Sequence, residues 1–187
     1  MAELATLVER CRRGDDLAWE ALVRRFQGRI YGLAMHYLRD PEEARDMAQE
    51  IFVQVYRRLD SFREDENLVP WMLRVGRNLC IDRLRRIKAR PPAADVVLDE
   101  TTELAADAPT PEETAEVEGR RRLLERALGG MSDKHREVIL LKDIQGLKIE
   151  EIADMLAEPV GTIKSRSNRA RLELAARVRA LDPSYGT

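Results

Sequence analysis

The chain has 187 residues with a net charge of −2, and 44% of them are hydrophobic, 35% charged and only 5% aromatic, which allows one ordinary domain or two small ones. No apolar run approaches the roughly 18–20 residues that span a bilayer, and MAELATLVER lacks the basic-then-apolar order of a secretion signal, so we expect a cytoplasmic protein without direct membrane insertion. Residues 1–90 carry +3, residues 91–118 carry −9 and residues 119–187 carry +4, and two basic ends around an acidic middle indicate a nucleic-acid partner.

Helix signals dominate the first 90 residues, and no segment shows the sustained alternation of a strand. A short first helix should end before Gly14-Asp15-Asp16, and a second should cover about 17–38. Asp40-Pro41-Glu42-Glu43 combines a capping residue with proline at the first helical position, so a third helix should run to about Leu59. A fourth, over about 68–88, should end before Pro91-Pro92.

The third helix has one apolar and one acidic face. The face expected to be buried carries Ala44, Ala48, Ile51, Phe52, Val55 and Leu59. The opposite face carries Asp46, Gln49, Glu50, Val53 and Arg57. An exposed valine among carboxylates is typical of a protein-binding surface, although a merely solvated acidic face explains the pattern equally well.

The fourth helix is strongly basic, with seven cations and one carboxylate between Arg74 and Arg90. One side of its helical wheel collects Arg74, Arg77, Asn78, Arg85 and Lys88. Such a stripe suits a nucleic acid, and the nearby Trp71 is placed either to stack on an unpaired base or to anchor the core. Two apolar stripes, one from Leu68 to Leu79 and one from Leu73 to Ile87, indicate that the helix is buried on two sides or bends near Gly76.

The segment PPAADVVLDETTELAADAPT (91–110) is acidic and flanked by proline. We interpret residues 91–118 as a flexible linker between two small helical domains, residues 1–90 and 119–187. The next helix should start at Thr110-Pro111 and end near Gly129-Gly130. Ser132 should cap a helix over about 133–144 that Gly146 breaks, and a short helix should cover 149–156.

The stretch VGTIKSRSNRARLELAARV (160–178) predicts a helix with a mostly apolar face and a basic face. The apolar face carries Ile163, Ser167, Ala170, Leu174 and Val178. With the short helix before it, this stretch has the pattern of a helix–turn–helix, whose second helix enters the major groove of DNA. The candidate DNA-binding residues, which would meet base edges or phosphates, are Thr162, Lys164, Ser165, Arg166, Asn168, Arg169 and Arg171. The alternative is a solvated basic face on an ordinary helical hairpin.

Three segments together resemble an extracytoplasmic function (ECF) sigma factor of bacterial RNA polymerase. DPEEARDMAQEIFVQVYRRLDSF (40–62) is similar to the family's polymerase-binding helix, and PWMLRVGRNLCIDRLRR (70–86) to its promoter-melting and minus-ten segment. REVILLKDIQGLKIEEIADMLAEPVGTIKSRSNRAR (136–171) resembles the domain that reads the minus-thirty-five element. The resemblance implies an all-α protein with a region 2 helical bundle and a region 4 helix–turn–helix.

By this resemblance the chain binds core RNA polymerase, at the clamp helices of the largest subunit and at the flap, and directs initiation at specific promoters. It implies polymerase contacts by Asp46, Gln49 and Glu50, supported by Phe52, and we add the exposed neighbour Val53. It places Asn78 near the flipped minus-ten base, with Arg74 and Arg77 beside it. The basic stripe and its aromatic neighbour add Trp71, Arg85 and Lys88 as minus-ten and melting candidates. Asn168 stands where the family often has an apolar or aromatic residue, and Lys164 where it often has arginine, so the promoter sequence is not predicted.

The resemblance also implies an anti-sigma factor as a regulator, and a linker path through the polymerase's channels. We hypothesise that acidic linker residues suit a basic channel made for RNA, against the alternative of a solvated tether; they are Asp95, Asp99, Glu100, Glu103 and Asp107. A stand-alone helix–turn–helix regulator is the rival function, but it leaves residues 40–90 unexplained. An enzyme, a metal or a cofactor is not expected, because His36 and His135 are isolated, Cys11 and Cys80 lack ligand spacing, and no phosphate-binding glycine loop is present.

Overall fold

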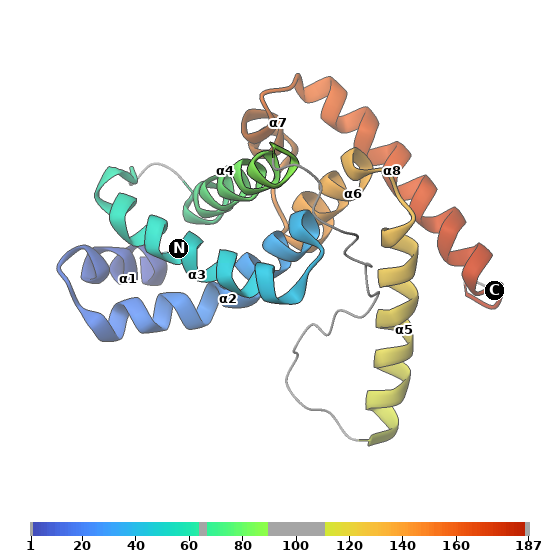
Figure 1. The fold of residues 1–187 in the computed structure, drawn as a ribbon, viewed down its shortest axis with the longest axis horizontal. Coiled ribbons are helices and arrows are strands. Elements are labelled where there is room, and N and C mark those ends of the chain that lie inside the picture. Colours follow the sequence, from blue (N-terminus) through green and yellow to red (C-terminus); the bar gives the residue numbers. More distant parts are fainter. Residues whose placement is uncertain (1, 64–66, 90–110, 186–187) are drawn as a thin grey trace. The chain divides into compact units, whose positions relative to one another are not determined.

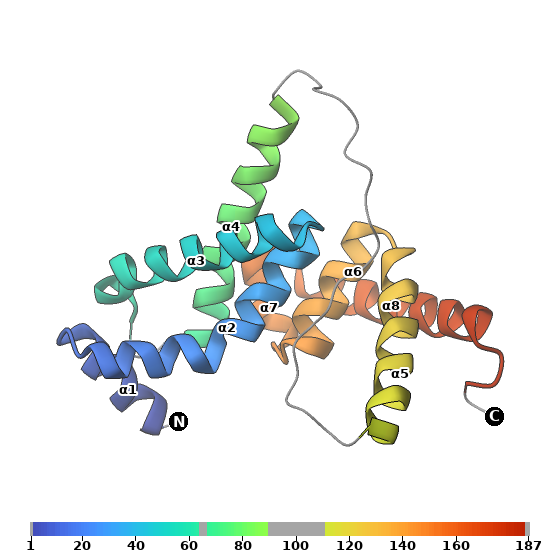
Figure 2. The ribbon, with the colours of Figure 1, turned by 60° about the horizontal axis from the view of Figure 1, so that its bottom comes forward.

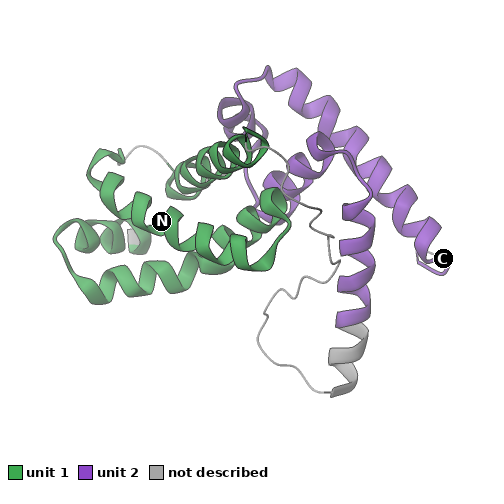
Figure 3. Ribbon diagram, viewed as in Figure 1, with its two compact units in different colours: residues 1–105 green, residues 106–187 purple. Residues whose placement is uncertain are grey.

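The computed structural model describes residues 2–63, 67–89 and 111–185 (Figure 1). The hypothesised channel residues from Asp95 to Asp107 lie outside these ranges. The chain divides into two compact units, residues 1–105 and 106–187 (Figure 3). Every element in the described ranges is helical, which confirms the predicted all-α class.

The described part of the first unit forms five helical elements: α1 (Ala2–Arg12), α2 (Asp16–Leu38), α3 (Pro41–Arg58), the 3-10 turn η1 (Leu59–Ser61) and α4 (Leu68–Ala89). The Asp15 carboxylate caps α2 by accepting a hydrogen bond from the Ala18 amide at 3.1 Å, and Asp40 caps α3 in the same way through Glu43 at 2.8 Å. Arg39, in the left-handed conformation with φ 56°, ends α2. The chain then turns directly into α3, which packs against α2.

Helices α2, α3 and α4 share the core of the first unit. Its largest fully buried side chains are Leu22, Ile30, Leu33, Ile51, Val55, Met72 and Leu73. α4 is one continuous helix through Gly76, and residues of both its apolar stripes are buried as far as Cys80, which confirms burial on two sides rather than a bend.

Two details of the predicted core are wrong. On α3, Met47 is buried and Ala48 is only half-buried, because position 47 continues the stripe of Ala44 and Ile51 with a longer side chain. On α4, the end of the second stripe is not buried, and Ile87 is 47% exposed. Figure 2 shows the reason, since this end of α4 extends past α2 and α3.

Between residues 111 and 185 the second unit also forms five elements: α5 (Pro111–Gly129), α6 (Asp133–Ile139), the π turn η2 (Leu140–Ile144), α7 (Ile149–Leu156) and α8 (Val160–Leu181). The helix predicted over 133–144 is therefore α-helical only to Ile139 and finishes as a π turn. Gly146, with φ +73°, follows it as expected for a glycine in the left-handed region. α8 packs against α5, α6 and α7, with Leu141, Ile152 and Ile163 fully buried.

Gly76 allows the close packing of α4 on its neighbours. A Cβ atom at this position would lie 2.8 Å from Leu33 Cδ2 and 3.1 Å from Ile51 Cδ1. We expect Gly76→Ala to lower the free energy of unfolding by about 1–2 kcal/mol, because overpacking outweighs the helix propensity of alanine. Denaturant unfolding followed by tryptophan fluorescence measures this, since the chain's two tryptophans, Trp19 and Trp71, both belong to the first unit.

The control is Gly28→Ala in α2, where a Cβ would meet no described heavy atom within 4 Å. This variant should be as stable as the original chain or more stable by up to ~1 kcal/mol. Equal stability of the Gly76→Ala and Gly28→Ala variants would contradict the close packing at Gly76.

Candidate nucleic-acid interface

α7 and α8 form the helix–turn–helix that the sequence predicts. Ala157, with φ 53°, ends α7, and Pro159 precedes the first residue of α8. Three side chains on α8 have no solvent exposure: Ile163, Ser167 and Ala170. Leu174 and Val178 continue this face as half-buried residues. The predicted packing face is thus confirmed, and it fixes which side of α8 faces solvent.

The N-terminal half of α8 presents a polar surface to solvent. The exposed candidates on it are Thr162, Lys164, Ser165, Asn168 and Arg169. The Ser165 hydroxyl donates to the Thr162 carbonyl at 3.0 Å, and Arg169 Nη2 donates to Ser165 Oγ at 3.3 Å. These groups combine a guanidinium, an ammonium, an amide and hydroxyls, which are the donors and acceptors that read base edges in the major groove.

Arg166 and Arg171, the two remaining candidates on α8, form ion pairs within the second unit. Arg166 is only 13% exposed and binds both carboxylate oxygens of Glu158, with Nη1 3.0 Å from Oε1. Arg171 binds Asp143 on η2, with Nε 3.4 Å from Oδ2, and this hydrogen bond and charge raise the pKa of Arg171. Both arginines therefore tie α8 to its neighbours, and their contact with phosphates stays a prediction.

Glu173, the only carboxylate of the basic stretch, joins α8 to the start of α6. Its Oε2 lies 2.5 Å from His135 Nδ1, and its Oε1 accepts from Arg177 Nε at 3.1 Å. The hydrogen bond from His135, followed by that from Arg177, lowers the pKa of Glu173. Spacing alone signals the pairing with Arg177, four residues on, but the contact with His135 is nonlocal and has no sequence signal.

The exposed face of α3 is the one that the helical wheel predicts. Its exposed residues include all four polymerase-binding candidates, Asp46, Gln49, Glu50 and Val53, and the Val53 side chain is 47% exposed. Phe52, on the opposite side, is buried. Sequence reasoning missed an aromatic cluster beside this face, in which Tyr56, 50% exposed, packs edge-on against Trp19 with ring centroids 5.0 Å apart.

The candidates on α4 lie at two different depths. Trp71, Arg74 and Arg77 are half-buried, whereas the exposed members are Asn78, Arg85 and Lys88. The Trp71 ring packs against Phe62, with centroids 5.2 Å apart, so it has a core neighbour and a solvent-exposed part at once. Among the other cations, Arg83 binds Glu43 of α3 through contacts of 2.7–3.0 Å.

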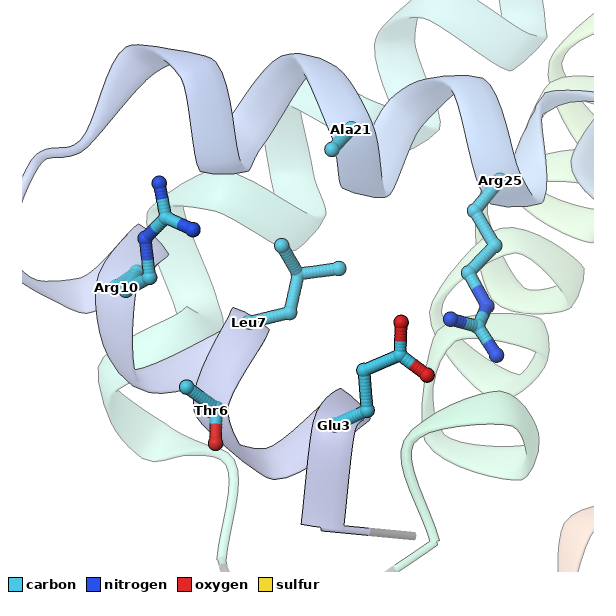
Figure 4. Close-up of a pocket in the computed structure, with 6 residues that line it drawn as sticks. All are labelled: Glu3, Thr6, Leu7, Arg10, Ala21 and Arg25. Carbon is cyan, nitrogen blue, oxygen red and sulfur yellow. The ribbon is translucent and has the colours of Figure 1, made fainter.

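A depression of about 390 Å³ lies between α1 and α2 (Figure 4). It is lined by Glu3, Thr6, Leu7, Arg10, Ala21 and Arg25. None of the predicted site residues is among them. Within the described ranges, no group of three His, Cys, Asp or Glu residues is arranged to hold a metal ion, and no helix has the length and apolarity to cross a membrane.

Each of the two units contains a match to a model of a known protein family. The family model Sigma-70 region 2 matches residues 22–90, and the model Sigma-70, region 4 matches residues 121–174. The first match contains α4, and the second contains α7 and α8 as far as residue 174. They define the class, which is that of the sigma-70 initiation factors rather than of any enzyme.

Curated relatives and solved structures narrow the assignment. The chain is 34% identical over 170 residues to the RNA polymerase sigma-H factor of Pseudomonas aeruginosa, covering 88% of each chain. It is 33% identical over 180 residues to the ECF RNA polymerase sigma-E factor of Escherichia coli K12, covering 94% of each. The chain therefore belongs to the ECF sigma factor family.

Two solved structures share this fold. CnrH, solved in complex with the cytosolic domain of CnrY, is 26% identical and has a TM-score of 0.65, with 94% of this chain and 97% of that one covered. The sigma factor RpoE of Bartonella quintana, solved with the anti-sigma factor NepR, is 21% identical and has a TM-score of 0.68, with coverages of 89% and 97%.

The Glu173 pair predicts a pH-dependent contribution to stability. Because the folded-state pKa is lowered, the contribution is fully present above the ordinary value of 4.5 and is lost as the pH falls through the folded-state pKa. We expect Glu173→Gln to destabilise the chain by about 1 kcal/mol near pH 7 and by less near pH 3. Denaturant unfolding followed by circular dichroism at both pH values measures the difference.

Glu118→Gln is the matched control, because Glu118 is exposed on α5 and lies 3.9 Å from its partner Arg122. It should leave stability within about 0.5 kcal/mol of the original at both pH values. A Glu173→Gln effect that is the same at pH 7 and pH 3 would contradict the role of the ionised carboxylate.

Proposed function

We propose that this chain is an alternative sigma factor that binds core RNA polymerase and directs initiation at a specific set of promoters. The observation that carries the proposal is the polar surface of α8, where Lys164, Ser165, Asn168 and Arg169 all face solvent opposite a fully buried face. An initiation factor of this kind performs no catalysis, since phosphoryl transfer belongs to the polymerase.

The second unit would read the minus-thirty-five element. In this role α8 lies in the major groove, and Thr162, Lys164, Ser165, Asn168 and Arg169 reach the base edges from its N-terminal half. Arg166 and Arg171 would contact phosphates at the flanks while Glu158 and Asp143 hold their guanidinium groups against the domain.

The first unit would bind the minus-ten element and the melted strand. The basic side of α4 offers Arg74, Arg77, Asn78, Arg85 and Lys88 to the backbone and bases of the non-template strand. The half-exposed Trp71 would stack on an unpaired base. Extruding a base costs a few kcal/mol, which these contacts together with the polymerase must offset.

The exposed face of α3 would bind the clamp helices of the polymerase's largest subunit. Asp46, Gln49 and Glu50 supply acceptors, Val53 supplies apolar area, and the buried Phe52 supports the helix from behind. The flap would hold the second unit. We further propose the division 1–90, 91–118 and 119–187, in which the acidic middle segment spans the polymerase between the two DNA-binding parts.

An anti-sigma factor is the regulator that we propose. The solved complex of CnrH with the cytosolic domain of CnrY supports a protein partner for this fold. Such a partner would have to cover the α3 face or the α8 surface, because each is required for initiation.

Run-off transcription tests the proposed function. Core polymerase, the purified chain and a library of promoter fragments should yield discrete transcripts that are absent without the chain. Binding of the chain to core polymerase, measured by pull-down, separates a sigma factor from a stand-alone regulator. A chain that binds promoter DNA alone but never core polymerase would establish the rival function.

The proposed role of the exposed face of α3 predicts how a substitution there changes the affinity of the chain for core polymerase. We expect Glu50→Arg to weaken binding to core polymerase about tenfold or more, because it places a cation where an acceptor is required. Fluorescence anisotropy of the labelled chain titrated with core polymerase measures this. Glu20→Arg on α2 makes the same charge change at an exposed residue that pairs with Arg24 at 2.6 Å, and it should bind normally. Equal effects of the two changes would show a nonspecific response to net charge.

The α8 surface makes a prediction about promoter choice. Asn168→Ala and Arg169→Ala should each cost about 1–3 kcal/mol in holoenzyme binding at one upstream position and relax base preference there. Selection from a randomised promoter library, followed by sequencing, measures the preference. Arg179→Ala, an exposed cation on the last turn of the same helix, should leave the selected sequence unchanged. If all three variants select the same promoter sequence as the original chain, the proposal that α8 reads the upstream bases is wrong.

A further inference from the structure

The guanidinium group of Arg12 joins α1 to η1 and to the residue that follows η1. Nε donates to the Leu59 carbonyl at 3.2 Å, and Nη2 donates to the Phe62 carbonyl. These two carbonyls belong to the first residue of η1 and to the residue directly after it. The Arg12 side chain is only 19% exposed, whereas that of Arg13 is 75% exposed. Arg12 is thus packed within the first unit, whereas Arg13 is a surface residue.

The Phe62 side chain connects Arg12 to Trp71. The Arg12 guanidinium lies over the Phe62 ring, with Arg12 Cζ 5.9 Å from the ring centroid. The Phe62 ring also packs against the ring of Trp71 on α4, and the two ring centroids are 5.2 Å apart. Phe62 is 7% exposed, so its ring is buried among its neighbours. Because the planar guanidinium donates hydrogen bonds to two carbonyls, it holds the backbone at Phe62 in position. The Phe62 ring in turn holds the half-exposed Trp71 ring in its orientation.

We propose that Arg12 is a positioning residue for promoter melting, acting through Phe62 on Trp71. The inference rests on the proposed role of Trp71 in holding an unpaired base. It assigns a function to α1, which lies outside the residues that match the region 2 family model. α1 would pre-form the base-stacking surface before DNA binds, so that less ordering is needed when the strand opens.

The first test uses the fluorescence of Trp71 in the free chain. In a Trp19→Phe background, Trp71 is the only tryptophan. Arg12→Ala should shift its emission to longer wavelength and increase its quenching by acrylamide, because the ring loses its ordered neighbour. Arg13→Ala, which removes only an ion pair with Glu9 at 3.0 Å, should leave both quantities unchanged. Arg12→Lys should give an intermediate result, since an ammonium group cannot donate to both carbonyls in the planar geometry of a guanidinium.

The second test measures open-complex formation by the holoenzyme, through permanganate reactivity of unpaired thymines on a promoter found by run-off transcription. Arg12→Ala should reduce the open fraction about tenfold, while core-polymerase affinity stays that of the Arg13→Ala control. Adding Arg12→Ala to Trp71→Ala should cause little further loss, because the two residues act in series.

Three results would overturn the proposal. They are an Arg12→Ala variant that matches Arg13→Ala in both emission and opening, a loss of core affinity as large as the loss of opening, and effects of Arg12→Ala and Trp71→Ala that simply add. Failure of the proposed function looks different, because the original holoenzyme would then open no promoter in the library. In that case the proposed role of Arg12 in promoter melting is wrong as well, and the fluorescence test still decides whether Arg12 orients Trp71.

Discussion

Burial of one helix face decides what the other face offers to a partner. On α8, Ile163, Ser167 and Ala170 are sealed against the second unit, and this fixes the rotation of the helix about its own axis. Because side chains repeat every 3.6 residues, the residues that point away from these buried positions must then face solvent, and they are Thr162, Lys164, Ser165, Asn168 and Arg169. α3 follows the same rule, since burial of Ala44, Ile51 and Val55 leaves Asp46 and Glu50 outside.

Charged side chains serve two different purposes in this molecule. Arg12, Arg83, Arg166 and Arg171 bind carbonyls or carboxylates of other elements and hold the helices together. Lys164 and Arg169 instead remain exposed on the face that we propose for DNA. An arginine that is already held by the fold loses less conformational entropy on binding, so ion-paired arginines at the edge of an interface fix its geometry while exposed ones supply recognition.

Much of this arrangement could be predicted from the sequence, because it depends on local patterns. Capping residues such as Asp40 and Ser132 fixed the helix starts, and periodicity fixed the buried faces of α3 and α8. Helical periodicity and charge selected the candidate site residues, the family resemblance assigned their roles, and their contacts with polymerase and DNA stay predictions. Nonlocal features could not be predicted: the π turn at η2, the His135–Glu173 contact and the bridge from Arg12 to Phe62 join residues with no periodic relation. Ile87 was misjudged because an apolar stripe does not reveal where its packing partners end.

The central claim is that α4 and α8 act on two separate places of one promoter, and only when core polymerase is present. A DNA-cleaving reagent attached at Asp82→Cys on α4 or at Leu172→Cys on α8 tests this directly, because both positions are exposed while the native Cys11 and Cys80 are buried. The account predicts cleavage near the minus-ten element from the first position and near the minus-thirty-five element from the second, in each case dependent on polymerase. Cleavage at one shared place, or the same cleavage without polymerase, would contradict it.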